Sequence, residues 1–403
     1  MENNSSSNES YLLTSESVTE GHPDKLCDKI ADSILDALIE QDPESKVAVE
    51  VAISNQLIVL LGEVTTKAKV EFEEIAKEVL YDIGYQNKET GFDLNSCRII
   101  SNINPQSTDI GTGVNNALES RNKEQSSDEF DQQGAGDQGI VFGFACNETK
   151  AYMPMPIYLA HQLTKQLAQT RHDHMEEFLL PDGKAQVTVE YRNNKPFAIN
   201  NIIVSSQHKE TISNEQLSDY ILKEVIQKSI PDSLLNNSPS MLIHINPSGR
   251  FVIGGPLGDA GLTGRKIVVD TYGGSAKHGG GAFSGKDPSK VDRTGAYMSR
   301  YIAKNLVASG ITDKIEIQIA YGIGIANPIA INFDCFGTNK IDLKLIKKII
   351  DQVFDCRPGA IINQFDLKRP IYSQLSSYGH FGRDDLDLPW ENLDKISTIK
   401  KLI

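Results

Sequence analysis

The order helix, strand, strand, helix recurs three times along the 403 residues of this chain. In each round, apolar residues at helical spacing precede two strand-like runs, and a second helical pattern follows. The rounds predict elements at 24–40, 47–53, 57–64 and 67–82, then at 156–170, 185–191, 199–206 and 214–228, and finally at 292–308, 315–321, 329–335 and 341–354. No sequence identity links the rounds, so chance recurrence of a common order stays open.

The recurring order predicts an α+β fold of three structurally similar domains, each a sheet backed by helices. We expect an N-terminal domain at 11–118, a central domain at 134–250 and a C-terminal domain at 251–390. Between the first two domains, the polar stretch 119–133 has no long apolar run and predicts a mobile loop. The polar residues 1–10 predict a disordered tail.

Overall composition excludes several classes of protein. The chain carries 40 basic and 54 acidic residues, a net charge of −14, which argues against binding to nucleic acid or an anionic membrane surface. It has no run of about 18 apolar residues and no secretory signal at its start, so no membrane span is expected. The five cysteines form no Cys-x-x-Cys pair, so we expect reduced thiols in a cytoplasmic enzyme and no zinc site.

The segment 250–304 departs from this acidic background. It holds nine Lys and Arg, four Asp and no Glu, and it contains 12 of the 31 glycines. Cations interleaved with glycines suit a small polyanion, because glycine lets backbone N–H groups approach an anion. The alternative is a flexible surface loop with solvated lysines.

Within this segment, residues 280–286 have the Gly-x4-Gly-Lys spacing of a phosphate-binding P-loop. Asp287 stands where such a loop has Ser or Thr for magnesium, and Pro288 prevents a long helix from starting at the lysine. A true P-loop is therefore not predicted, although the glycines and Lys286 retain the means to bind an anion. A nucleotide-dependent phosphotransferase and a non-catalytic nucleotide-binding protein stay open as alternatives.

Other charged residues suggest a triphosphate and a metal. Arg265 and Lys266 follow a glycine-rich turn, and Lys290 lies near Asp292. Adjacent cations reach one anion only when the anion is large or the backbone is irregular, and a triphosphate is large enough. A carboxylate beside a lysine suits a phosphate chain bridged by a divalent metal, since the lysine takes free oxygens and the carboxylate takes the metal.

The N-terminal motif SESVTEGHPDK, residues 15–25, predicts the start of a helix. Pro23 opens the helix and Asp24 lies in its first turn. A plain capped helix is the simpler interpretation. His22 adds a functional one, because a histidine beside a helix N-terminus is able to donate to an oxyanion or a leaving oxygen.

Together, four motifs resemble the S-adenosylmethionine synthetase (methionine adenosyltransferase) family, in its bacterial form: GHPDK at 21–25, GAGDQG at 134–139, GGPLGDAGLTGRKIVVDTYGG at 254–274 and GGGAFSGKDPSKVDR at 279–293. The match extends from about residue 11 to the YGHFGR segment at 378–383. The resemblance implies the fold of that family, with three similar domains in a pseudo-threefold arrangement. It also implies synthesis of S-adenosyl-L-methionine from ATP, L-methionine and water, with hydrolysis of the triphosphate to phosphate and pyrophosphate.

The resemblance further implies roles for individual residues. For ATP it implies His22, Asp182, Lys184, Arg250, Phe251, Asp259, Arg265, Lys266, Ala282 and Lys286. Among these, the expected catalytic residues are His22, Lys184, Arg265 and Lys286. For methionine it implies Glu63, Gln106, Asp259, Lys290 and Ile323. Two Mg²⁺ per site are expected, bound by Asp24 and Asp292, and K⁺ is expected at Glu50.

Finally, the resemblance implies an assembly. Members of the family form tight dimers, often paired into homotetramers, and each active site is built from two subunits. We therefore expect a homo-oligomer, a dimer of dimers with the active site at the dimer interface. The stretch 119–133 departs from the common form of the family, so the dynamics of the neighbouring loop at 104–114 are expected to differ more than the chemistry.

Overall fold

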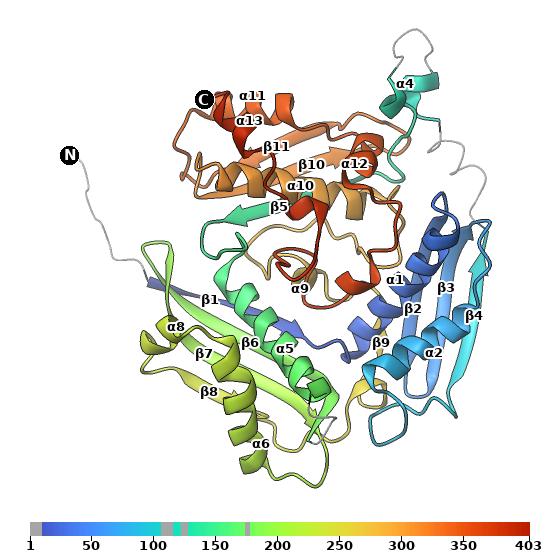
Figure 1. Cartoon of the computed structure of the whole chain (residues 1–403), viewed down its shortest axis with the longest axis vertical. Coiled ribbons are helices and arrows are strands. Elements are labelled where there is room, and N and C mark those ends of the chain that lie inside the picture. The colour runs from blue at the N-terminus through green and yellow to red at the C-terminus, as the bar shows by residue number, and fades with distance from the viewer. Residues whose placement is uncertain (1–9, 106–115, 122–127, 174–177) are drawn as a thin grey trace.

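The computed structural model describes residues 10–105, 116–121, 128–173 and 178–403. Three β-sheets, each with helices packed on it, surround a common centre (Figure 1). In that view the first sheet lies at the right, the second at the lower left and the third at the top. The predicted α+β fold with three sheets backed by helices is confirmed.

The first sheet has the order β4 (Arg98–Asn104), β3 (Leu57–Thr65), β2 (Lys46–Ser54), β9 (Gly261–Leu262). Helix α1 (Pro23–Gln41) packs on β2 and on α2 (Phe72–Ile83). Alternate residues of β2 are buried against the helices, namely Val47, Val49, Val51 and Ile53. This burial explains the period-two pattern, because successive side chains of a strand point to opposite faces.

The second sheet has the order β1 (Ser10–Val18), β6 (Leu179–Arg192), β7 (Lys195–His208), β8 (Leu242–Ile245). Helix α5 (Met155–Asp173) packs on β1 and β6. The second helical segment of this domain comprises α6 (Asn214–Ile221), the π-helical turn η2 (Leu222–Ile226) and α7 (Gln227–Ser229), followed by α8 (Asp232–Asn236).

The third sheet has the order β11 (Ala330–Asp334), β10 (Lys314–Tyr321), β5 (Gly139–Cys146). Its main helix, α10 (Val291–Ala308), packs on β5 and β10. The remaining helices of this part are α11 (Leu343–Val353), α12 (Pro358–Phe365) and α13 (Ile396–Lys400). Shorter turns are α4 (Leu118–Arg121), α9 (Ile267–Asp270), η1 (Glu129–Asp131), η3 (Gly255–Leu257), η4 (Ser373–Leu375) and η5 (Pro389–Glu391).

Each sheet contains one strand from a different segment of the chain. Strand β1 leaves the N-terminal segment and pairs antiparallel with β6. Strand β5 pairs with β10, and the short β9 pairs with β2. The three domains are therefore interlocked by strand exchange, and the segment boundaries predicted from the sequence do not describe which strands share a sheet.

Most predicted elements are present, and four predictions need correction. The helix expected at 67–82 starts only at Phe72, and the one expected at 214–228 is interrupted by the π-helical turn. Ser10 belongs to β1 and hydrogen bonds to Glu190, so it is not part of a disordered tail, and the other residues of the predicted tail, 1–9, lie outside the described part.

The fourth correction concerns the loop predicted at 119–133. Its residues 122–127 lie outside the described part of the chain. Before them, the Glu119 carboxylate accepts the backbone N–H groups of Ala326 and Asn327. After them, Arg357 forms ion pairs with Asp128 and Asp131. Both flanks are thus anchored to the third domain rather than free.

The sequence predicts reduced thiols and no membrane-spanning helix. All five cysteines are free thiols, four of them buried. Among the described residues, no helix is long and apolar enough to cross a membrane.

Close packing of α10 on β5 requires a glycine at position 143. A Cβ placed there would overlap the backbone of Ser299 and Arg300. We expect Gly143→Ala to lower the free energy of unfolding by about 1–3 kcal/mol, since added atoms in a tight contact force the backbone apart. Gly359→Ala is the matched control, because a Cβ there meets only ordinary contacts near Phe130. Equal melting temperatures for the two variants would contradict the prediction.

Candidate active site

The predicted site residues gather in two clusters. The first cluster lies at the N-terminus of α1 and comprises His22, Asp24, Asp182, Lys184, Arg250, Phe251, Asp259, Arg265 and Lys266. The second lies where the loop 279–290 meets β2 and comprises Glu50, Glu63, Lys286, Lys290, Asp292 and Ile323. Within the described residues, no hydrogen bond or ion pair joins the two clusters. Gln106, predicted for methionine, lies outside the described part.

His22 is the N-cap residue of α1 and is buried. Its Nδ1 accepts a hydrogen bond from the backbone N–H of Asp24 at 3.2 Å. Burial, together with the nearby cations Lys184 and Lys266, lowers the pKa of His22 to about 3. The ring is therefore neutral with its proton on Nε2, and its 4.0 Å approach to the Asp24 carboxylate is not an ion pair. A neutral imidazole in this tautomer is a hydrogen-bond donor from Nε2 to an anion.

Asp24 holds the cation-bearing turn against the helix. Its Oδ2 lies 2.6 Å from Lys266 Nζ, and its Oδ1 accepts the Leu262 N–H at 3.0 Å. Burial alone would raise the pKa of this carboxyl, but these hydrogen bonds lower it below the usual value. Arg265 is exposed and makes no hydrogen bond or ion pair with the described residues, so its charge is available to a ligand.

Lys184 and Asp182 come from β6, which pairs with β1 just before His22. Lys184 lies opposite Val18, is exposed, and forms no ion pair with the described residues. Asp182 is 7% exposed, and its Oδ2 accepts the Gly255 N–H at 2.9 Å. Its Oδ1 is buried without a partner in the described part of the structure. Burial raises the pKa of Asp182 from 3.8 to about 6, which the Gly255 N–H and Lys184 only partly offset.

Gln207 is a residue that the sequence analysis missed. Its side chain accepts the Asp182 N–H at 3.3 Å and donates to the Val252 carbonyl at 3.1 Å. It thereby ties β6 to the segment that carries Arg250 and Phe251. It also donates to the Thr90 carbonyl at 3.3 Å. Nothing in its sequence context distinguishes it from a strand residue, because all three partners are distant in sequence. Arg250 is exposed and pairs with Glu210 at 2.7 Å.

Asp259 is the exposed acidic residue of the first cluster. Its carboxylate accepts the backbone N–H of Ala260. Its charge helps to raise the pKa of Asp182, so the two carboxyls are near each other. The structure thus brings Asp182, expected to bind ATP, close to Asp259, expected to bind both ATP and methionine.

In the second cluster, Lys286 Nζ lies 2.7 Å from Asp292 Oδ2. Lys286 forms a β-bridge with Ala48, which places its loop on the edge of β2. Lys290 pairs with the buried Asp287, whose Oδ2 also accepts the Val47 N–H at 2.7 Å. The loop is therefore fixed to the first sheet by both main-chain and side-chain contacts.

Glu50 and Glu63 lie on the face of the first sheet that α1 does not cover. Glu50 pairs with Leu61, and Glu63 pairs with Ala48, so both glutamates project from the same face. Both are exposed. Ile323 is 47% exposed and forms a β-bridge with Ala135 of the GAGDQG motif, whose Gly136 N–H donates to the Ser289 carbonyl next to Lys290. Ala282 lies at the border of the two clusters, because a Cβ at Gly264 would overlap its Cβ.

Several glycine N–H groups do not have the role proposed from the sequence. The Gly264 N–H donates to Asp28 and the Gly285 N–H donates to Asp32, each at 2.8 Å. The Gly255 N–H donates to Asp182. The interpretation that these glycines offer their N–H groups to an anion is therefore wrong for these three residues. Their partners are carboxylates of the protein itself.

The carboxylates of the two clusters fit a metal that is shared with phosphate. Mg²⁺ prefers oxygen ligands and is often held by one or two carboxylates plus substrate phosphates. Asp24 and Asp292 each offer one carboxylate beside a lysine. The described residues contain no group of three or more His, Cys, Asp or Glu placed to form a metal cage. The donor set therefore suits a metal bound together with phosphate.

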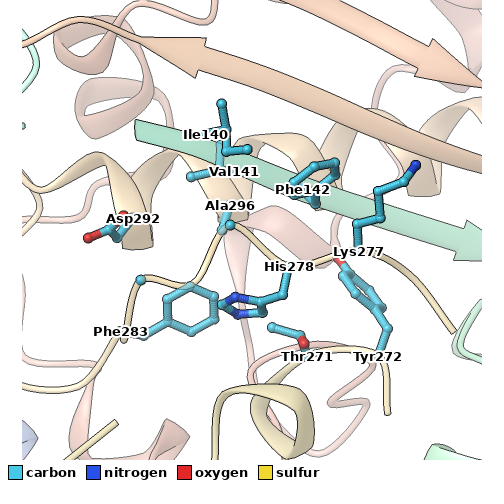
Figure 2. A pocket seen from close by; sticks show the side chains of 12 residues that line it. Ile140, Val141, Phe142, Thr271, Tyr272, Lys277, His278, Phe283, Asp292 and Ala296 are labelled. Carbon is cyan, nitrogen blue, oxygen red and sulfur yellow. The ribbon is translucent and has the colours of Figure 1, made fainter. Parts of the chain in front are cut away.

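The cavity next to Asp292 is too small for a nucleoside. It measures about 10 Å³ and is lined by the aromatic side chains of Phe142, Tyr272, His278 and Phe283. Figure 2 shows Asp292 at the edge of this pocket, with its carboxylate directed away from the rings. A ligand of Asp292 would thus lie on the surface outside the pocket.

Comparison with known proteins decides the family. The chain matches three family models, described as the N-terminal domain (residues 10–108), the central domain (132–251) and the C-terminal domain (253–392) of S-adenosylmethionine synthetase. The chain belongs to the S-adenosylmethionine synthetase family. It is 53% identical to the S-adenosylmethionine synthases of Clostridium acetobutylicum and Clostridium botulinum, and 52% identical to that of Clostridium tetani. Each alignment covers 97% of this chain and 99% of the relative.

This membership confirms the resemblance read from the four motifs and the predicted enzyme class, methionine adenosyltransferase. Synthesis of S-adenosylmethionine from ATP and methionine is supported, and the alternative phosphotransferase is not favoured. Enzymes of the S-adenosylmethionine synthetase family use metal ions. Individual site residues stay predictions.

Buried Asp182 makes stability depend on pH. Its pKa of about 6 in the folded chain exceeds the ordinary 3.8, so ionisation costs folding free energy as pH rises through this window. We expect Asp182→Asn, which keeps an acceptor for the Gly255 N–H, to be more stable than the wild type above about pH 6, by up to about 3 kcal/mol. This difference should vanish below about pH 4. Chemical unfolding across this range measures it, and a pH-independent difference would contradict the assigned pKa.

Proposed function

We propose that this chain makes S-adenosyl-L-methionine in two steps at a site formed by the two clusters. The methionine sulfur attacks C5′ of ATP, the S–C5′ bond forms, and the triphosphate leaves with the electrons of the C5′–O bond. Water then splits the triphosphate into phosphate and pyrophosphate. Triphosphate is a highly charged leaving group, so groups that neutralise it stabilise the transition state. The single observation that supports this most is that the four cations expected at the triphosphate lie in these clusters together with His22, namely Lys184, Arg265, Lys266 and Lys286.

The first cluster has the chemistry for the leaving group. Neutral His22 would donate from Nε2 to the departing oxygen, since its Nδ1 is occupied as an acceptor. Lys184 and Arg265 are available cations in the described structure and would bind phosphate oxygens directly. Lys266 would do so after giving up part of its contact with Asp24.

The second cluster would supply further contacts to the phosphates and to methionine. Lys286 would bind phosphate, and the methionine would lie among Glu63, Gln106, Asp259, Lys290 and Ile323. Asp24 and Asp292 would hold Mg²⁺, two ions per site, and Glu50 would lie beside K⁺. When bound, Mg²⁺ supplies positive charge that screens the phosphate oxygens.

We further propose that the protein is a homo-oligomer, a dimer of dimers, with each site shared between two subunits. The open face of the first sheet carries exposed apolar residues beside Glu50 and Glu63, namely Leu57, Leu61, Ile100 and Leu262. An exposed apolar sheet face favours covering by another chain. A second copy seated there would bring its first cluster to these glutamates. The free thiols support a cytoplasmic location, where cysteines stay reduced.

A product assay tests the reaction. The purified protein is incubated with ATP, methionine, Mg²⁺ and K⁺, and products are resolved by mass spectrometry. We expect S-adenosylmethionine with equal amounts of phosphate and pyrophosphate. Lys184→Ala should keep its fold but lose about 2–4 kcal/mol of transition-state stabilisation. Lys77→Ala, on the exposed surface of α2, is the control. ADP as the main product would contradict the proposal.

Mixed oligomers test the shared site. Lys266→Ala removes a cation of the first cluster and Lys286→Ala one of the second, so each variant alone should be nearly inactive. When both are co-expressed in equal amounts, a mixed dimer would contain one intact site, and activity should recover to about a quarter of the wild type. Mass spectrometry of the intact assembly confirms mixing. Mixed dimers without recovered activity would place both clusters in one subunit's site.

A further inference from the structure

Residues 246–266 form one continuous segment of the first cluster, with different chemistry near its two ends. Phe251, near the beginning, is expected at ATP, and its aromatic ring suits stacking on a nucleobase. Arg265 and Lys266, at the end, are cations that suit phosphate. The segment thus has a nucleoside end and a phosphate end, and the distance between them has to match one nucleotide.

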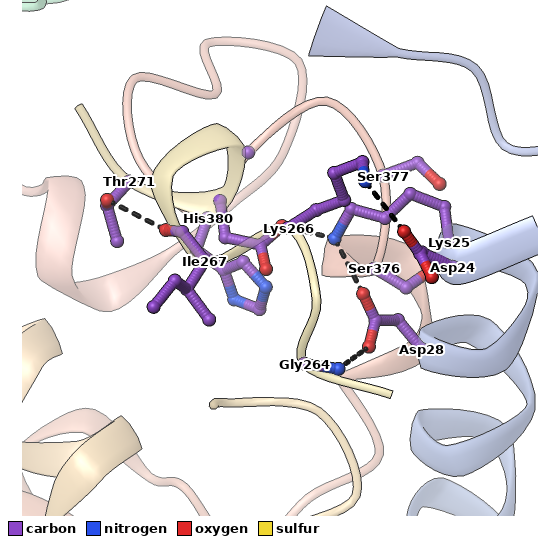
Figure 3. A network of polar contacts seen from close by, with 12 residues as sticks. Asp24, Lys25, Asp28, Gly264, Lys266, Ile267, Thr271, Ser376, Ser377 and His380 are labelled. Carbon is purple, nitrogen blue, oxygen red and sulfur yellow. Dashed lines mark hydrogen bonds and ion pairs between the residues drawn. The ribbon is translucent and has the colours of Figure 1, made fainter. Parts of the chain in front are cut away.

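The phosphate end is held by helix α1. The Leu262 N–H donates to Asp24 at 3.0 Å, and the Gly264 N–H donates to Asp28 at 2.8 Å. Figure 3 shows the contact of Asp28 with Gly264, next to Lys25, whose Nζ lies 2.9 Å from Asp28. Because these hydrogen bonds are made by residues 262–264, the main chain around Phe251 has to be fixed from elsewhere.

The nucleoside end is held by the last three residues of β7, Ser206, Gln207 and His208, which are all buried. The side-chain amide of Asn246 accepts the Ser206 N–H at 2.8 Å and donates to the Ser206 carbonyl at 2.9 Å. Asn246 has a φ of 42°, in the left-handed region that asparagine tolerates. The chain therefore turns at Asn246 while it stays bound to the strand.

His208 binds both main-chain groups of Phe251. Its own N–H donates to the Phe251 carbonyl at 3.0 Å, and its ring Nε2 accepts the Phe251 N–H at 3.1 Å. The other ring nitrogen, Nδ1, lies 2.9 Å from the carbonyl of Lys209, which is only an acceptor. Nδ1 therefore carries the proton and Nε2 is the acceptor. These two partners fix the ring, and the ring fixes the main chain of Phe251.

Gln207 binds the next residue, Val252. Its Nε2 donates to the Val252 carbonyl at 3.1 Å and to the Thr90 carbonyl at 3.3 Å, while its Oε1 accepts the Asp182 N–H at 3.3 Å. Gln207 and His208 are 0% and 2% exposed, so neither side chain is able to touch a substrate. Phe251, in contrast, is only half-buried and keeps surface for a ligand.

We propose that His208 and Gln207 are positioning residues for the nucleoside of ATP. They fix the main chain of Phe251 and Val252, so that the Phe251 ring is in place before ATP binds and little conformational freedom is lost on binding. All of these contacts lie within one subunit and within or beside the first cluster. The inference rests on the proposed assignment of Phe251 to ATP.

Two substitutions separate the two ring contacts of His208. An asparagine amide is short and keeps a donor near the position of Nδ1, so His208→Asn loses the acceptor for the Phe251 N–H. A glutamine amide reaches further, so His208→Gln keeps that acceptor and loses the donor to Lys209. Ser238→Ala is the matched control, because Ser238 Oγ accepts the Ile199 N–H at 2.8 Å near the opposite end of β7. It too leaves one buried main-chain N–H without its acceptor.

The test measures four quantities for each full-length variant: the KM for ATP and the KM for methionine in synthesis, the rate of hydrolysis of added tripolyphosphate, and the melting temperature. Tripolyphosphate has no nucleoside, so a general loss of structure slows its hydrolysis whereas a loss of nucleoside positioning does not. We expect His208→Asn to raise the KM for ATP by about 10-fold, with the KM for methionine and the hydrolysis rate within about twofold of wild type.

The other two variants have distinct expected results. His208→Gln should keep the KM for ATP within about threefold of wild type, since the Phe251 N–H keeps an acceptor. Ser238→Ala should lower the melting temperature about as much as His208→Asn does, while its kinetic values stay within about twofold of wild type.

Three results would overturn the positioning role: a wild-type KM for ATP in folded His208→Asn, an equal loss of tripolyphosphate hydrolysis in that variant, or an equal rise of the KM for ATP in Ser238→Ala. Gln207→Met, which frees the Val252 carbonyl, tests the same role if His208→Asn does not fold. It should also raise the KM for ATP, and a wild-type value there would likewise overturn the role.

Phe251→Ala calibrates the assignment on which the inference rests. If this variant keeps the wild-type KM for ATP, Phe251 does not contact the nucleoside, and the inference fails with the assignment. If it raises the KM for ATP while His208→Asn does not, only the positioning role fails. A wild type that forms no S-adenosylmethionine would instead refute the proposed function itself.

Discussion

The proposed function requires several cations to bind one triphosphate, yet cations placed close together repel one another. This constraint explains much of the arrangement around α1. Lys266 and Lys286 are each paired with a carboxylate, Asp24 and Asp292, in the described structure. These are the carboxylates expected to bind metal. A metal-bound triphosphate would therefore exchange partners with existing ion pairs, the lysines turning to phosphate and the carboxylates to metal, rather than enter a site of unbalanced charge.

The buried cations of the chain are likewise balanced by carboxylates. Arg293 and Lys25 are buried, and each is matched by carboxylates of α1 or of the segment after Lys266. Burial raises the pKa of Asp270 to about 7, with a further contribution from the Asp28 charge, although Lys25 opposes this rise. Removing one partner of such a group would leave an uncompensated buried charge. These ion pairs hold the loops in place, whereas buried ion pairs in general add little net stability because desolvation offsets their attraction.

The sequence predicts the local elements well because their signals are local. Apolar periodicity located the three helix–strand–strand–helix rounds, and Pro23 marked the start of α1 correctly. Strand exchange was not predictable, because β9 has only two residues and β1 pairs with a strand more than 150 residues away. Asp28 and Asp32 of α1 gave no signal either, because only the folded structure shows that they accept the distant Gly264 and Gly285 N–H groups. Gln207 gave no signal, since its role depends on three backbone groups that are distant in sequence.

The glycine-rich motifs also gain a different explanation from the one that phosphate binding suggests. A Cβ at Gly261 would overlap the backbone of Pro23, and one at Gly285 would overlap that of Val49. Gly285 also has a φ of 79°, where other residues are strained. These glycines allow the cation-bearing loops to lie directly against α1 and β2. The loops then place side-chain cations rather than main-chain N–H groups at the surface. Under the proposed function, these long side chains on a fixed main chain would follow the triphosphate as it leaves and is cleaved.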